Sequence, residues 1–163
     1  MTVFKDDINI TGLDSIPRVM PNSQNNGANV KFARGHVAIA AADADGDSYV
    51  MARLPSNSVI KDIKVLCDAI TAGTDFDLGV NYPTNKGSAV IDKDCLMDGQ
   101  TLATASKVLD GFAAPAIENR YKQLWELAGL TADPCHNLDI VLTGNTVGTA
   151  AGDVVVEIEY MAK

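Results

Sequence analysis

The sequence predicts a mainly β protein: an antiparallel β-sandwich, jelly-roll-like, with one short helix and an extended N-terminal arm. From residue 36 onward, apolar and polar residues alternate with period two in several short segments, and turn-forming residues separate these segments. Alternation with one polar face is typical of antiparallel sheets whose outer face is solvated. Two such sheets packed face to face form a sandwich, and the jelly roll is a common version of it.

The first 35 residues differ from the rest, so we predict an arm over 1–35 and a β-sandwich domain over 36–163. The arm has two prolines, a polar SQNNGAN stretch and no sustained periodicity. It either packs partly on its own domain or docks on a partner or neighbouring subunit and orders only there. The candidate partner contacts are its apolar residues: Val3, Phe4, Ile8, Ile10, Leu13, Ile16, Val19 and Met20.

Seven strands are predicted, over 36–42, 48–54, 59–70, 75–82, 88–92, 138–144 and 153–161. The side chains expected to face inward are Val37, Ile39, Ala41, Val50, Ala52, Leu54, Ile63, Val65, Cys67, Phe76, Leu78, Val80, Tyr82, Leu138, Ile140, Leu142, Val154, Val156, Ile158 and Tyr160. In the fourth strand, Asp75, Asp77 and Asn81 are expected to face solvent.

The segment between the fifth and sixth strands has two parts. Residues 92–115 show no clear period and predict a long, partly ordered connection. In 116–130, apolar residues at helical spacing predict one helix, with Gly129 as its stop. The residues on the apolar face of this helix are Ile117, Tyr121, Leu124 and Trp125, and Trp125 is expected to pack against the sheet.

Composition excludes several function classes. A net charge of −8 argues against a nucleic-acid partner, because phosphate binding needs clustered Lys and Arg. No apolar run approaches the ~20 residues of a membrane helix, and the first residues lack the features of a signal peptide. Cys67, Cys95 and Cys135 have no CxxC spacing, which favours a reducing compartment.

The stretch DADGD, residues 43–47, has the composition of a calcium loop. An EF-hand loop requires Gly at position 6 and a bidentate Glu at position 12. Counted from Asp43, Gly46 falls at position 4 and Leu54 at position 12. The flanking strands favour the tip of a hairpin instead. A cation at Asp43, Asp45 and Asp47 is the alternative.

No constellation of residues indicates an enzyme, and we expect no catalytic, cofactor-binding or metal-binding residues. The sequence lacks the G-x-S-x-G, HExxH and Walker motifs. Cys135 adjoins His136, but neighbouring residues on a strand or loop point in different directions. The aspartate pairs in DFD (75–77) and DKD (92–94) could serve glycoside hydrolysis, but solvated strand faces produce the same pattern.

Five segments follow one another in a familiar order: GDSYVMARLPSNSVIKDIKVLCDAI, DFDLGV, DKDCLMDG, LWELAGLTADP and TAAGDVVVEIEYM. This order resembles small virion proteins of tailed bacteriophages, of the capsid decoration (cement) or head structural type, over residues 36–163. The resemblance implies a structural protein that binds the outer surface of a phage capsid and stabilises it through subunit and arm contacts. It also implies the major capsid protein as partner, a homo-oligomer with a trimer favoured, and assembly in the host cytoplasm onto the virion exterior.

Two other function classes stay open. A carbohydrate-binding β-sandwich module of a phage fibre or spike needs exposed aromatic residues on one sheet face. The candidates are Tyr49, Tyr82, Tyr121, Trp125 and Tyr160, most of them at positions expected to face inward. A metal-dependent jelly-roll enzyme needs a histidine cluster, which the sequence lacks.

Overall fold

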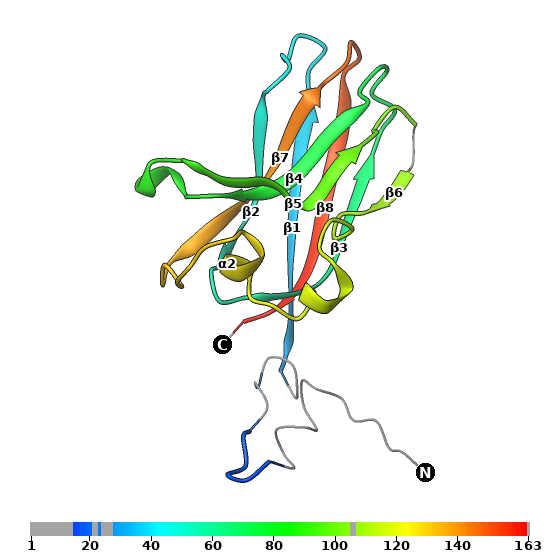
Figure 1. The fold of residues 1–163 in the computed structure, drawn as a ribbon. Helices are drawn as coiled ribbons and strands as arrows, with labels where there is room; N and C mark the ends of the chain where they lie inside the picture. Colours follow the sequence, from blue (N-terminus) through cyan, green and yellow to red (C-terminus); the bar gives the residue numbers. More distant parts are fainter. Residues whose placement is uncertain (1–14, 21–22, 24–27, 105–106, 163) are drawn as a thin grey trace, which may run out of the picture.

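Two four-stranded antiparallel sheets pack face to face in the computed structural model, which describes residues 15–20, 23, 28–104 and 107–162 (Figure 1). The first sheet has the order β1 (Val30–Ile39), β8 (Gly152–Met161), β3 (Val59–Cys67), β6 (Lys107–Asp110). The second sheet has the order β2 (Ser48–Pro55), β7 (Asn137–Thr146), β4 (Asp75–Asn81), β5 (Val90–Gln100). Apart from β4 and β5, consecutive strands lie in opposite sheets. This arrangement confirms the predicted antiparallel β-sandwich.

The core lies between the two sheets and is built from the alternating residues of the central strands. Those of β3, β4, β7 and β8 are buried as predicted: Ile63, Val65, Cys67, Phe76, Leu78, Val80, Leu138, Ile140, Leu142, Val154, Val156 and Ile158. Each fully buried Val, Leu, Ile or Phe contributes about 1.5–3 kcal/mol relative to an exposed side chain. Apolar burial between the sheets therefore dominates the stability of the fold.

The predicted inward faces of the first two strands are partly wrong. Val50 is 61% exposed, whereas Met51 is 5% exposed and buried in the core. The cause is a bulge in β2, because the register with β7 shifts between Val50 and Ala52. Because of the extra residue, the inward-facing side chains are Met51 before the bulge and Leu54 after it, although three positions separate them. Ala41 is also exposed, since β1 ends at Ile39.

Residues 92–115 are not a long connection, and that prediction is wrong. They contain most of the 11-residue strand β5 and all of β6. The register of β5 against β4 shifts at three places, which breaks the alternation along its sequence. Leu96 and Met97 are consequently both buried although they are neighbours.

The predicted helix over 116–130 is two separate single turns. A 3₁₀ turn, η2, spans Ile117–Asn119, and the α-helix α2 spans Leu124–Leu127. Between them the chain is extended at Gln123, and the amides of Leu124 and Trp125 donate to the carbonyls of Ser58 and Ser56. These bonds to the connection before β3 prevent a continuous helix. The one short helix of the predicted fold is therefore α2, and Gly129, with φ of 73°, follows its end.

Trp125 packs against the core, as expected. It is partly buried there, and its indole N–H donates to the side chain of Gln123 at 2.9 Å. Among the described residues, no helix has the length and hydropathy needed to cross a membrane.

The strand connections give the sandwich two different ends (Figure 1). We call one the acidic end; it is formed by 40–47, 68–74, 101–104 and 147–151, which contain no Lys or Arg. The opposite, arm end is formed by the start of β1, the end of β8, and the connections 56–58 and 111–136. The connection 82–89, which contains the 3₁₀ turn η1 (Thr84–Lys86), projects from the side of the sandwich.

Residues of the predicted arm are described only in part. β1 begins at Val30, so residues 30–35 pair with β8 inside the first sheet. Ile16, Val19 and Met20 are exposed, and residues 15–20 lie beyond the arm end (Figure 1). The other candidate contacts lie outside the described residues: Val3, Phe4, Ile8, Ile10 and Leu13. The division at residue 35 stays a prediction.

Candidate functional site

The aspartates of DADGD bind their own backbone. Asp43 accepts from the amide of Ala40 at 2.9 Å and from the hydroxyl of Tyr49 at 2.8 Å. Asp47 accepts from the amide of Ala44 at 2.8 Å. The burial of Tyr49, followed by its bond to Asp43, raises the pKa of the phenol. Two of the three carboxylates therefore shape the turn itself.

The third aspartate binds this turn to the connection between β7 and β8. Asp45 accepts from the amide of Val147 at 3.0 Å, and the amide of Gly46 donates to the carbonyl of Gly144 at 2.7 Å. Gly46 has φ of 94°, as a tight reversal requires. The turn interpretation is confirmed, but the hairpin is wrong, because β1 and β2 lie in different sheets and do not pair. The segment connects the two sheets at the acidic end.

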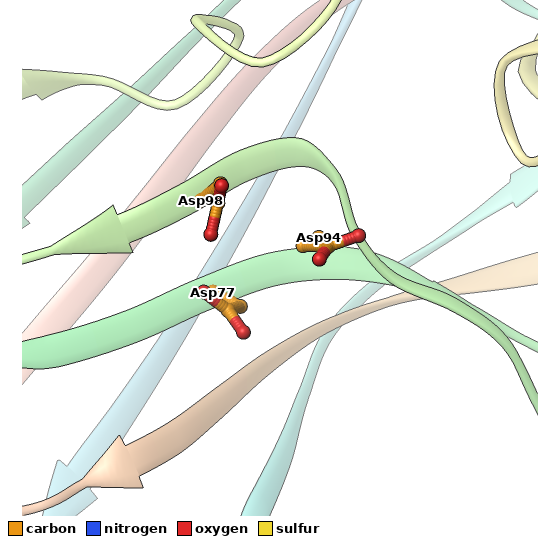
Figure 2. Close-up of side chains that lie close together, drawn as sticks. All are labelled: Asp77, Asp94 and Asp98. Carbon is orange, nitrogen blue, oxygen red and sulfur yellow. The ribbon is translucent and has the colours of Figure 1, made fainter.

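One aspartate of DFD and one of DKD meet in space together with Asp98, which the sequence patterns of the separate pairs do not reveal. Asp77 of β4 and Asp94 and Asp98 of β5 place carboxylate oxygens within 4.8 Å of one another; we call them the carboxylate cluster (Figure 2). The strong turn signal PTNKG between the two segments pointed to adjacent antiparallel strands. The missing information was the length of β5.

Asp77 is buried, so the prediction that it faces solvent is wrong. It is 1% exposed, and its oxygens accept from the amide of Gly99 at 2.9 Å and from Asn145 Nδ2 at 2.6 Å. Lys93 Nζ lies 3.5 Å from Asp77 Oδ2. A buried carboxylate needs such partners. Asp77 therefore joins β4, β5 and β7 on the outer face of the second sheet.

A hollow of about 340 Å³ lies beside the cluster, lined by β5 and the segment before and within α2. Burial, and then the side-chain hydrogen bond with Asp94, raise the pKa of Asp92. Burial, and then the charges of Asp92 and Asp94, raise the pKa of Cys95 to about 12. Cys95 is therefore a thiol near neutral pH and a poor nucleophile.

Carboxylate oxygens are the ligands that hard cations prefer. In the cluster, however, Asp77 already holds two hydrogen bonds and an ammonium group. The same three contacts explain its position without a catalytic or metal-binding role.

A second hollow, of about 330 Å³, has the opposite chemistry. We call it the basic hollow; its lining residues are Arg53, Pro83, Asn85, Lys86, His136 and Asn137. It lies between the projecting connection 82–89, the end of β2 and the start of β7.

The Cys135–His136 pair does not form a nucleophile and base. Cys135 Sγ contacts the carbonyl of Asp133 at 3.5 Å, whereas His136 Nδ1 lies 2.7 Å from the carbonyl of Asn137. The rings of His136 and Tyr82 are 5.7 Å apart. The two side chains are engaged separately, as the sequence argument expected.

Comparisons with known proteins show a likeness of fold. No family model matches the chain, and no curated protein matches it. A chain from the solved "Capsid of Ralstonia phage GP4" has a TM-score of 0.61 and 16% identity, with 83% of this chain and 85% of that chain covered. A chain from the "Cyanophage Pam1 capsid asymmetric unit" has a TM-score of 0.53 and 18% identity, with 90% and 94% covered. The resemblance to phage head structural proteins is therefore matched in fold: this chain folds like chains of two bacteriophage capsids.

Proposed function

We propose that the protein is a structural virion protein of a tailed bacteriophage, without enzymatic activity, that binds the outer surface of the capsid and stabilises it. The observation that carries this proposal is the coverage of the structural likeness. The matches span 85% and 94% of the capsid chains. Those chains are thus small sandwiches of similar extent and not domains within a large shell subunit. A small separate subunit in a capsid suits a protein that decorates or cements the shell.

Charge supports a position on the exterior. The net charge of −8 disfavours a surface that faces packaged DNA, because like charges repel. The acidic end carries carboxylates and no Lys or Arg. The proposed orientation therefore points the acidic end outward and the arm end toward the shell.

The arm end offers apolar contacts. Val30, Phe32, Ile117 and Tyr121 are exposed there, and the exposed residues Ile16, Val19 and Met20 lie in the segment that leads to β1. The proposed arm contacts, to the major capsid protein or to a neighbouring copy in a trimer, are Val3, Phe4, Ile8, Ile10, Leu13, Ile16, Val19 and Met20. Apolar side chains of this kind gain binding energy by leaving water.

The edge of the first sheet offers a second mode of contact. β1 is an edge strand, and an edge strand can accept a further strand from a partner. At Gly35, β2 approaches so closely that a Cβ would lie 2.0 Å from the carbonyl oxygen of Met51. Strand addition is therefore proposed at the beginning of β1, next to the arm.

The carbohydrate-binding alternative finds little support in the aromatic residues. Tyr49, Tyr82, Trp125 and Tyr160 are partly buried and pack against the core, so they do not form an exposed sugar-stacking face. Tyr121 is exposed, but it lies in the connection between η2 and α2.

Co-sedimentation with undecorated capsids tests the proposal. The purified protein should pellet with the shells, saturate at a fixed number of copies per shell, and raise the temperature at which the shells open. A bovine serum albumin control should stay in the supernatant. Protein that remains in the supernatant at every salt concentration tried would refute the decoration role.

A further inference from the structure

The basic hollow is unusual in a chain of net charge −8. Its lining has three basic side chains, Arg53, Lys86 and His136, and the side-chain amides of Asn85 and Asn137, but no carboxylate. Hydrogen-bond donors therefore outnumber acceptors around it. Such a lining suits an anionic group.

Arg53 is held in place from below by Asp139. Arg53 Nε and Nη2 donate to the two carboxylate oxygens at 2.6 and 2.9 Å, and the Asp139 side chain is only 3% exposed. This two-point contact fixes the plane of the guanidinium group and leaves its other N–H groups for a ligand. A side chain that is already fixed loses less conformational entropy when it binds.

Lys86 supplies the charge that Asp139 does not neutralise. Lys86 ends η1 and makes no ion pair with the described residues. His136 Nδ1 donates to the carbonyl of Asn137 at 2.7 Å, so His136 forms part of the wall of the hollow while Arg53 and Lys86 supply the donors for a carboxylate. Lys86 lies in an exposed turn, so its ammonium group can reach a bound ligand without rearrangement of the sandwich.

We propose that the basic hollow binds a carboxylate, namely a glutamate or aspartate side chain of another protein subunit. A volume of about 330 Å³ suffices for one such side chain. A nucleic acid fits less well, because its neighbouring phosphates would lie within a Debye length of about 8–10 Å of an acidic surface. A single carboxylate interacts only with the basic side chains of the hollow and brings no further negative charges close to the acidic surface. The site goes beyond the proposed function and does not depend on it, because it can be tested on the isolated protein.

The test is an NMR titration of the ¹⁵N-labelled full-length protein with the capped peptide acetyl-Gly-Glu-Gly-amide. The Gln peptide of the same length is the matched ligand control, and inorganic phosphate is a separate arm. We expect saturable shifts at the amides of Lys86, Asn137 and their neighbours with the Glu peptide, and none with the Gln peptide. Shifts confined to phosphate, or identical shifts with both peptides, would overturn the assignment.

Variants locate the site. Lys86→Gln should weaken Glu-peptide binding about three- to tenfold, as expected for the loss of one partly exposed charged contact. Lys61→Gln removes the same charge from the outer face of the first sheet, where Lys61 pairs with Glu159, and should leave binding unchanged. Equal weakening in both variants would show a general charge effect and refute the site. Peptide binding that persists when capsid co-sedimentation fails would refute only the decoration role.

Discussion

Replacement of Asp77 by Ala tests whether the carboxylate cluster is structural. The variant removes the acceptor for the amide of Gly99 and one acceptor for Asn145, and it leaves the Gly99 amide without its partner. Hydrogen bonds to a charged group contribute about 1.5–3 kcal/mol each. Asn145 keeps its bond to Asp75 at 3.1 Å, so part of the loss is compensated. The expected decrease in the free energy of unfolding is therefore about 3–5 kcal/mol.

Asp77→Asn separates hydrogen-bond geometry from volume. Whichever way the amide is turned, its NH₂ group faces a donor, either the amide of Gly99 or Asn145 Nδ2. This isosteric variant should therefore also be destabilised. Asp98→Ala is the matched control, because Asp98 belongs to the same cluster but its carboxylate is exposed. Its free energy of unfolding should stay within about 0.5 kcal/mol of the parent value.

Urea unfolding followed by Trp125 fluorescence and by circular dichroism measures these differences. For a chain of this length, the expected loss corresponds to a decrease in Tm of roughly 6–20 °C. If Asp77→Ala and Asp98→Ala differ by less than about 1 kcal/mol, Asp77 is not the structural tie described above. A ligand role for the cluster would then have to be considered again.

Three further outcomes are expected. Gly79→Ala should destabilise the fold by about 3 kcal/mol or prevent folding, because its Cβ would lie 2.2 Å from the carbonyl oxygen of Asp92. The control is Gly87→Ala, where φ is 96° but the space around the Cβ is open; it should lower the free energy of unfolding by only about 1 kcal/mol in the same urea assay. Deletion of residues 1–27 leaves β1 intact and should abolish capsid co-sedimentation while Tm stays nearly unchanged; undiminished binding in an intact oligomer would refute the arm contacts. Iodoacetamide at pH 8 should label exposed Cys135 first and half-buried Cys95, whose pKa is raised to about 12 chiefly by burial, far more slowly, as read by peptide mass spectrometry. Labelling of Cys95 as fast as that of Cys135 in the folded protein would contradict the raised pKa.

The sequence predicted the strands that lie in the middle of each sheet and failed where the register slips. β7 and β8 keep a period of two on their inward face, and β3 keeps it from Ile63 to Cys67, because a central strand pairs on both sides and packs against the other sheet. The bulge of β2 depends on its pairing with β7, far away in the sequence, so no local pattern reveals it. The predicted strand over 88–92 marks the start of β5, but its continuation to Gln100 was missed for the same reason.

The candidate sites were predicted less well than the fold. Both aspartate pairs stand out in the sequence, yet the approach of Asp77 to Asp94 and Asp98 depends on the length and bulges of β5. The basic hollow combines residues from the end of β2, the projecting connection and the start of β7, and none of them stands out in its own segment. A local pattern can reveal a turn or a buried face, but not a cavity formed by three distant segments.

The two outer sheet faces differ in a way that narrows where a partner can bind. On the first sheet, Arg34 pairs with Glu157, His36 with Asp153 and Lys61 with Glu159. A partner on that face would have to displace or cover side chains that already form pairs with each other, and exposed pairs of this kind add little net binding energy. On the second sheet, Asp77, Asp139 and Val141 of the outer face are already buried by the chain itself. Exposed apolar side chains on the strands are otherwise single, namely Val50 on β2, Val90 on β5 and Val108 on β6, whereas Val30 and Phe32 lie together at the start of β1. The arm end and the adjoining hollow are therefore where contacts with a capsid should concentrate. Charge reversals on the first sheet, such as Glu157→Lys, should therefore affect capsid binding less than the loss of Phe32 or of the arm.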